Sequence, residues 1–234
     1  MVLCIETSTA VCSVALCDRN GIISFKESIE GKSHAAYLTV FIEQLLSEEG
    51  INAGELDAVA VSKGPGSYTG LRIGVSTAKG IAYGASIPLI GIETTTSMFY
   101  GITSELRLKY LADNQTLYVP VIDARRMEVY YTILDSEGKK VNNIKAEVIS
   151  EDSFSEIPES VRILFFGDGA EKCRKTLTRS NNGFVEEFRL SATFMYEPVI
   201  KALGEHHFED IAYFEPFYLK DFITSRPKKN ILGR

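Results

Sequence analysis

The stretch Lys63-Gly-Pro-Gly-Ser-Tyr-Thr-Gly-Leu-Arg-Ile-Gly-Val-Ser-Thr-Ala-Lys-Gly80 decides the fold class, because it joins an expected strand to an expected helix through a glycine-rich turn. Residues 57–62, just before it, form the short apolar run of a buried strand. Small residues then recur at every fourth position, namely Gly70, Gly74, Ala78 and Ala82. Such residues share one helix face, which is therefore almost bare of side chains. The pattern predicts an α/β protein.

This stretch allows two interpretations. A glycine-rich turn at a helix N-terminus can offer backbone N–H groups to a phosphate, whereas a bare helix face lets another segment approach closely. The turn lacks the Walker pattern, and Gly64-x-Gly66-x-x-x-Gly70 is one residue longer than the dinucleotide fingerprint. Tight packing of strand, turn and helix is therefore favoured, and phosphate binding stays the alternative.

Composition narrows the class of protein. The 234 residues are 45% hydrophobic and 24% charged, which suits one large or two small globular domains. No apolar run approaches the length of a membrane span, and the first residues start a strand without the pattern of a signal peptide, so we expect a cytoplasmic protein without membrane contact. A net charge of −6 argues against a chain that grips nucleic acid by itself.

The four cysteines show no C-x-x-C pair, and three of them lie in apolar runs: Cys4, Cys12, Cys17 and Cys173. Buried, reduced thiols are therefore favoured over a zinc site or disulfides.

The chain reads as two halves with one pattern. An apolar strand that ends in an acid, Ile5-Glu6, recurs as Ile122-Asp123, and the turn Asp18 to Gly21 recurs as Asp135 to Gly138. Each recurrence is offset by 117 residues, half of the chain. We predict two tandem βββαβαβα domains, with mixed sheets flanked by helices and a ligand cleft between the halves.

The expected boundaries follow from this repeat. Residues 1–114 form the first domain, 115–215 the second, smaller one, and 216–234 a tail. Helices are expected at 33–47, 70–84 and 93–110 in the first half. The second half is expected to contain strands at 117–123, 127–134, 141–149, 161–166 and 184–189, and helices at 151–157, 170–179 and 192–206.

With these halves, an acid followed by Thr7-Ser8-Thr9 and a late Gly167-Asp-Gly169, the chain resembles the actin-like ATPase superfamily, whose domains have a ribonuclease-H-like fold. Four stretches are similar to the TsaB (YeaZ) family: residues 5–9, 64–80, 122–130 and 216–219. The resemblance implies a non-catalytic subunit that binds TsaD, with the ATPase TsaE, for threonylcarbamoylation of the adenosine next to the anticodon in tRNA. It also implies that tRNA is contacted only through the complex.

The resemblance further implies a weak or vestigial nucleotide site. Superfamily members grip phosphates with the two equivalent hairpins, and the matching positions here are Glu6, Thr7, Ser8, Thr9, Gly64, Gly66, Gly167 and Gly169. Most such enzymes have Asp with a glycine-bearing turn where this chain has Glu6 and three hydroxyl residues. We therefore expect no cofactor for this chain alone, and place any ATP or ADP at the complex interface.

The partner surface is predicted on helices 33–47 and 70–84. The first carries more apolar and aromatic residues than one core-facing stripe needs, and the second offers the small-residue stripe. The residues chosen for the interface are His34, Tyr37, Leu38, Phe41, Arg72, Gly74 and Ala78. Two such helices from each of two related chains would form a four-helix contact, which gives a homodimer when the chain is alone and a heterodimer with TsaD.

Two other functions stay open. The first is an ATP-dependent small-molecule kinase, and the second is a TsaD-like metal-dependent transferase or hydrolase. TsaD-like proteins use an H-x-x-x-H pair, whereas this chain has His34 alone at that place and the adjacent His206 and His207 elsewhere, so no metal site is expected.

Two further charged stretches are interpreted as structural. Asp123-Ala-Arg125 could join the two halves of the fold or line the cleft between them, and the structural role is favoured. The basic tail with Arg226-Pro-Lys-Lys229 is most simply a solvated end, although it could touch tRNA phosphate or a partner.

Overall fold

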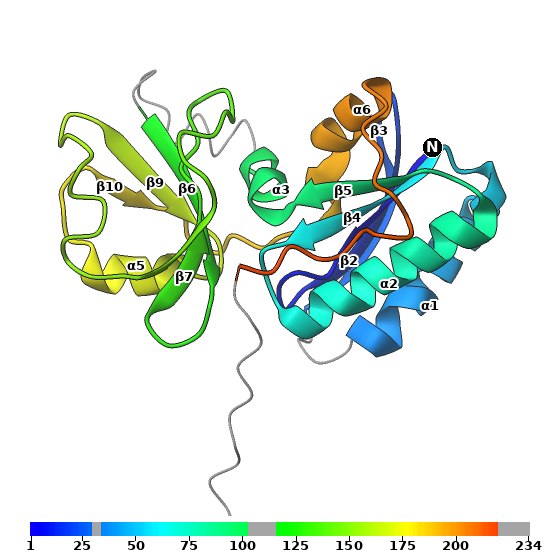
Figure 1. Cartoon of the computed structure of the whole chain (residues 1–234), viewed down its shortest axis with the longest axis horizontal. Coiled ribbons are helices and arrows are strands. Elements are labelled where there is room, and N and C mark those ends of the chain that lie inside the picture. Colours follow the sequence, from blue (N-terminus) through cyan, green and yellow to red (C-terminus); the bar gives the residue numbers. More distant parts are fainter. Residues whose placement is uncertain (30–33, 103–115, 220–234) are drawn as a thin grey trace, which may run out of the picture.

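The computed structural model describes residues 1–29, 34–102 and 116–219, which form two lobes (Figure 1). The first lobe is built on a five-stranded sheet of order β3-β2-β1-β4-β5. Its strands are β1 (Val2–Glu6), β2 (Cys12–Asp18), β3 (Gly21–Ser28), β4 (Ala58–Gly64) and β5 (Leu89–Glu93). The first three strands pair antiparallel, while β4 runs parallel to β1 and β5 parallel to β4.

The second lobe repeats this topology with the order β10-β9-β6-β7-β8. Its strands are β6 (Thr116–Asp123), β7 (Glu128–Tyr131), β8 (Lys145–Val148), β9 (Arg162–Phe166) and β10 (Asn182–Phe184). Glu6 and Asp123 each end the central strand of their sheet, as the sequence repeat predicted. The predicted fold class, two mixed sheets flanked by helices, is therefore confirmed.

Side-chain alternation along β1 explains how helices cover both faces of the first sheet. Leu3 and Ile5 point to the face covered by α1 (His34–Glu48) and α2 (Tyr68–Ala85), where they join the larger core cluster. Val2 and Cys4 point to the opposite face, which is covered by the 3₁₀ helix η2 (Ala192–Met195) and by α6 (Tyr196–Gly204). In Figure 1 the two helical layers lie on either side of this sheet.

Residues 192–214 pack on the first sheet, which differs from their expected place in the second half. Met195 and Val199 share a core cluster with Ile90 of β5, and the backbone N–H of Ala192 donates to Ser13 Oγ at 3.0 Å. Phe214 is buried in the opposite cluster. The division of the chain at residues 115 and 216 stays a prediction, but the packing assigns this helix to the first sheet. Sequence spacing cannot reveal this, because an apolar helix face fits either sheet.

Several helices and strands differ in length or position from the elements that the sequence predicted. The short helices are η1 (Ala53–Glu55), α3 (Thr94–Tyr100) and α5 (Ala170–Thr176). The helix expected at 93–110 is seen as α3, and its last part lies outside the described residues. The helix expected at 151–157 is wrong, because these residues form successive turns with Phe154 at a φ of 65°. The strand expected at 184–189 is also misplaced, since β10 covers Asn182–Phe184.

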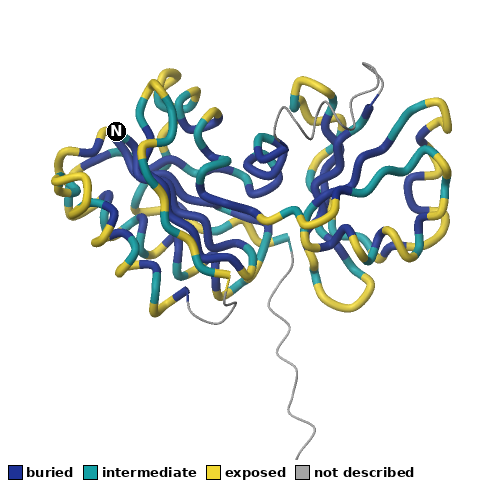
Figure 2. Tube along the Cα trace, turned by 180° about the vertical axis from the view of Figure 1, so that it is seen from behind, coloured by how far each residue is buried: buried dark blue, intermediate teal, exposed yellow. Residues whose placement is uncertain are grey.

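Buried strands run through both lobes (Figure 2). An apolar cluster joins them, because Met98 and Phe99 of α3 pack with Tyr118 and Ile122 of β6. The cysteines are all buried and free, as expected. Among the described residues, no helix is long and apolar enough to cross a membrane.

Candidate functional site: the region between the lobes

The glycine-rich turn and α2 lie directly on the turn that follows β1. The backbone N–H of Ser67 donates to the carbonyl oxygen of Ser8 at 2.6 Å, and Thr7 Oγ1 donates to the carbonyl oxygen of Gly70 at 2.8 Å. A Cβ at Gly66 would lie 2.3 Å from Ser8 O, and one at Gly70 would lie 2.0 Å from Thr7 O. The glycines are therefore needed for close packing within the chain, which was the favoured interpretation.

Glu6 is buried at the end of β1, and its carboxylate is satisfied by its own chain. Ser62 Oγ donates to Oε2, and the backbone N–H of Ser8 donates to Oε1 at 2.7 Å. Loss of hydration in this buried place raises the pKa of Glu6, although the hydrogen bonds from Ser62 and Ser8 oppose the rise. A carboxylate with both oxygens engaged inside the protein is not presented to a ligand.

His34, the first residue of α1, holds the same turn from another side. It is nearly buried, and its Nε2–H donates to the carbonyl oxygen of Thr9 at 2.8 Å. The imidazole thus fixes the start of α1 to the turn after β1.

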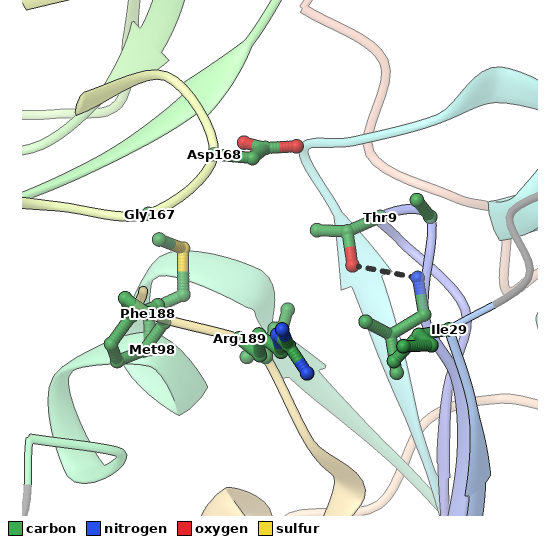
Figure 3. Close-up of a pocket in the computed structure, with 10 residues that line it drawn as sticks. Thr9, Ile29, Met98, Gly167, Asp168, Phe188 and Arg189 are labelled. Carbon is green, nitrogen blue, oxygen red and sulfur yellow. Dashed lines mark hydrogen bonds between the residues drawn. The ribbon is translucent and has the colours of Figure 1, made fainter. Parts of the chain in front are cut away.

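A cavity of about 330 Å³ lies between the lobes. Figure 3 shows Thr9 and Ile29 of the first lobe on one side, Gly167 and Asp168 of the second lobe across from them, and Met98 of α3 beside them. Phe188 and Arg189, from the segment that returns to the first lobe, complete the wall. The cavity is mostly apolar, with one carboxylate and one guanidinium.

Asp168 dominates the electrostatics of the second-lobe wall. Its Oδ1 accepts a hydrogen bond from the backbone N–H of Asp123 at 2.9 Å. The residue is open to solvent, yet its carboxyl group is packed among loop atoms, and this loss of hydration raises its pKa. The charge of Asp123 raises it further, while the backbone hydrogen bond and Lys172 lower it. Two acids at this place disfavour the phosphate groups of a nucleotide.

The structure separates the predicted nucleotide-site residues. Thr9 and Gly167 line the cavity, whereas Glu6, Thr7 and Ser8 are buried inside the first lobe. Gly64 and Gly66 face Phe217 and Ser8 of their own chain, and Gly169 packs on the backbone of Ile122. These eight positions therefore do not form one ligand-facing set, because the turn after β1 is filled by protein atoms.

The predicted partner-interface residues also divide. Arg72 is exposed, lies 4.3 Å from the Tyr68 ring centroid and donates from Nε to Tyr218 Oη at 3.2 Å. Tyr37 and Phe41 are half-buried and stack at 5.4 Å.

Four of the seven face inward: His34, Leu38, Gly74 and Ala78. The small-residue stripe of α2 packs on the chain's own β1 turn and sheet, and the role of these four residues at a partner interface stays a prediction.

Sequence reasoning missed most of the cavity wall. Asp168 lies within the Gly167-Asp-Gly169 turn, so its position at the cavity could have been predicted from the sequence. Phe188 and Arg189 carried no signal, because they were assigned to a strand of the second sheet. Within the described ranges, no group of three His, Cys, Asp or Glu side chains could hold a metal ion.

A duplicated mixed α/β fold with a cavity between its two lobes is the architecture expected of the actin-like superfamily. A family model described as "TsaD: tRNA N6-adenosine threonylcarbamoyltransferase" matches residues 27–221, so the chain belongs to this family. Within it, the chain is similar to TsaB (YeaZ) proteins.

The relatives support this grouping. The tRNA threonylcarbamoyladenosine biosynthesis protein TsaB of Escherichia coli is 33% identical over 130 residues, 56% of this chain and 53% of that protein. TsaB of Bacillus subtilis is 32% identical over 133 residues, 55% and 52% of the two chains. The matched part of the chain thus spans about half the length of each of these curated relatives. The solved structure of YeaZ from Pseudomonas aeruginosa shares the fold, with a TM-score of 0.78, 21% identity and coverage of 93% and 99%.

Proposed function

We propose that this chain is a non-catalytic subunit in the biosynthesis of threonylcarbamoyladenosine in tRNA, and that it acts by binding a TsaD-like transferase. The names of its relatives support the pathway. The observation that carries the non-catalytic role is the closed turn after β1, where Ser67 N–H donates to Ser8 O and the Glu6 carboxylate is buried.

The closed turn weighs against the kinase alternative. A phosphate-binding turn must offer free N–H groups to its ligand. Here the N–H of Ser8 is used by Glu6, and the N–H of Ser67 is used by Ser8. Opening this turn would expose the buried carboxylate and remove α2 from its packing.

The exposed sides of α1 and α2 form the proposed partner surface. Tyr83 on α2 is 80% exposed, and Val40 on α1 is 40% exposed. Gly80 and Gly84 of α2 have open space where a Cβ would lie, so packing within the chain does not explain them. Glycine in a helix costs about 1 kcal/mol relative to alanine, which a close contact with another helix would offset. The half-buried Tyr37 and Phe41, with exposed Arg72, border this surface.

The partner that fits this surface is a related chain with helices equivalent to α1 and α2, because the two helix pairs can then pack symmetrically. A TsaD-like subunit satisfies this condition, and a second copy of this chain satisfies it when TsaD is absent. In this proposal a TsaE-like ATPase joins the pair, ATP or ADP binds at the complex interface, and the assembly is cytoplasmic.

Two measurements test the proposal. Co-expression with the TsaD-like protein of the same organism should yield a stable complex on size-exclusion chromatography. Depletion of this chain should lower threonylcarbamoyladenosine in digested tRNA, as measured by mass spectrometry. Normal levels of the nucleoside after depletion would contradict the proposed function, and magnesium-dependent ATP turnover by the isolated chain would favour the kinase alternative.

A further inference from the structure

The turn between β6 and β7 holds two adjacent arginines in a backbone conformation that side-chain-bearing residues rarely adopt. Arg125 has a φ of 70° and Arg126 a φ of 52°. Positive φ values at two successive hairpin positions are usually supplied by Asn-Gly or Gly-Gly, because a Cβ crowds the backbone there. Residues kept in such a conformation point to a role outside folding.

The base of this turn is firmly held. The N–H of Ala124 donates to Glu128 O at 3.1 Å, and the N–H of Arg125 donates to Asp123 Oδ1 at 2.6 Å. Lys172 of α5 contacts Asp123 Oδ1 and donates to Glu128 O at 3.3 Å. The lysine therefore offsets the charge of Asp123 at the root of the turn and fixes the turn to the second lobe.

The guanidinium groups at the tip are available. Arg125 and Arg126 are both exposed, and neither guanidinium group has a hydrogen-bond or ion-pair partner among residues 1–29, 34–102 and 116–219. Two other arginines of this lobe are engaged: Arg174 pairs with Glu186 at 2.9 Å, and Arg179 donates to two carbonyl oxygens at 2.7 Å. The chain contains 31 acids, yet neither of these two adjacent guanidinium groups pairs with an acid in the described part of the chain.

We propose that the Arg125-Arg126 tip binds backbone phosphates of RNA. The planar guanidinium matches a phosphate through two parallel hydrogen bonds, and a rigid turn loses little entropy in making them. This inference rests on the proposed function, which brings tRNA to the complex. It goes further, because this chain itself then supplies a tRNA contact, on the lobe that does not carry α1 and α2.

The distribution of charge along the chain supports RNA over an acidic protein as the occupant. Residues 220–234 hold five of the 25 Lys and Arg residues but one of the 31 acids. The chain that precedes them passes between the lobes (Figure 1), where Phe217 N–H donates to Lys63 O. The root of the β6–β7 turn borders the same region, because Asp123 is bonded to the cavity residue Asp168. Two basic stretches in an otherwise acidic chain suit a polyanion such as RNA.

The test replaces both arginines with the residues that the turn itself prefers, as Arg125→Asn with Arg126→Gly. We expect the melting temperature to rise, because the backbone strain is removed. We expect the affinity for an unmodified tRNA transcript to fall about tenfold at low salt, and the slope of log K against log salt to fall by roughly 1.5 to 2, as for two lost phosphate contacts. Binding is measured by fluorescence anisotropy, with the full chain alone and with its TsaD-like partner.

A matched control removes the same charge elsewhere, as Arg19→Gln with Lys139→Gln, both exposed. This control should keep the salt slope. Arg125→Lys with Arg126→Lys should also keep the slope, because both charges remain, but should lose part of the affinity, because a lysine cannot make the paired hydrogen bonds. Unchanged affinity and slope in the Asn-Gly variant would overturn the inference, as would an equal loss in the control. Complex formation is followed separately by size exclusion, so failure of the proposed partner and failure of the RNA contact are distinguishable.

Discussion

Gly74 of α2 lies directly against Thr7 of the turn after β1, so that a Cβ at Gly74 would be only 2.2 Å from Thr7 Oγ1. The same hydroxyl donates to the carbonyl oxygen of Gly70, one helical turn earlier. The small-residue stripe of α2 is therefore explained by contact with the first strand's turn, and the outward glycines of the same helix require a different explanation.

Gly74→Ala should destabilise the protein by about 1–3 kcal/mol, because the added methyl group forces Thr7 to move within a packed region. Gly80→Ala is the matched control on the same helix, and it should stabilise by up to about 1 kcal/mol, because its Cβ meets open space. Urea unfolding followed by circular dichroism measures both. Equal effects of the two substitutions would contradict this account of the stripe.

Tyr83→Asp should weaken association with the TsaD-like partner at least tenfold, because it places a charge on the exposed side of α2. The monomer should keep its melting temperature, since Tyr83 is 80% exposed. Val148→Asp on β8 of the second lobe, at a residue 63% exposed, is the control and should bind normally. Isothermal titration gives the affinities, and normal binding by Tyr83→Asp would remove α2 from the proposed interface.

Glu6→Gln should alter how stability depends on pH. The pKa of Glu6 is raised above 4.5, so between 4.5 and the raised value the folded state keeps a proton that the unfolded state has lost. Stability of the native protein therefore falls as pH rises through this window, by up to about 1.4 kcal/mol per pH unit. The glutamine variant lacks this pH-dependent contribution to the free energy of unfolding. Its amide oxygen can still accept a hydrogen bond from Ser8 N–H.

The measurement is chemical unfolding of both proteins from pH 4 to 7.5. The difference in unfolding free energy should move in favour of Glu6→Gln as the pH rises. A difference that stays constant, or moves in favour of the native protein, would show that Glu6 is ionised without penalty.

Phe214→Ala should destabilise by about 3–5 kcal/mol, because Phe214 is only 7% exposed and packs in the core beneath α1 and α2. Phe217→Ala, at a residue 42% exposed three positions later, should change stability far less. Thermal unfolding of both variants tests whether the segment after α6 belongs to the first lobe. Similar small losses would place Phe214 outside the core.

Local and repeating features could be predicted from the sequence. The 117-residue repeat placed Glu6 and Asp123 at equivalent strand ends, and the strand-turn-helix reading of residues 57–84 is confirmed. These succeed because strand alternation, helix periodicity and turn residues act over a few neighbouring positions.

Predictions about which way a residue faces were less successful. The stripe at Gly74 and Ala78 fits a helix partner or a strand turn equally well by spacing, and only packing shows that Thr7 fills it. The hydroxyl residues after Glu6 suggested a ligand turn. However, the carbonyl oxygens of Ser8 and Thr9 accept from Ser67 and His34, and the Ser8 N–H donates to Glu6.

By itself, the sequence determined the duplicated α/β architecture, because the patterns that specify strands and helices lie in neighbouring residues. Only the tertiary structure decided that the glycine-rich stretch closes the turn after β1 and that α6 covers the first sheet. It also showed that the guanidinium groups of Arg125 and Arg126 have no partner among the described residues. These outcomes depend on contacts between residues far apart in the chain, where burial and hydrogen bonding choose among faces that local patterns leave equivalent.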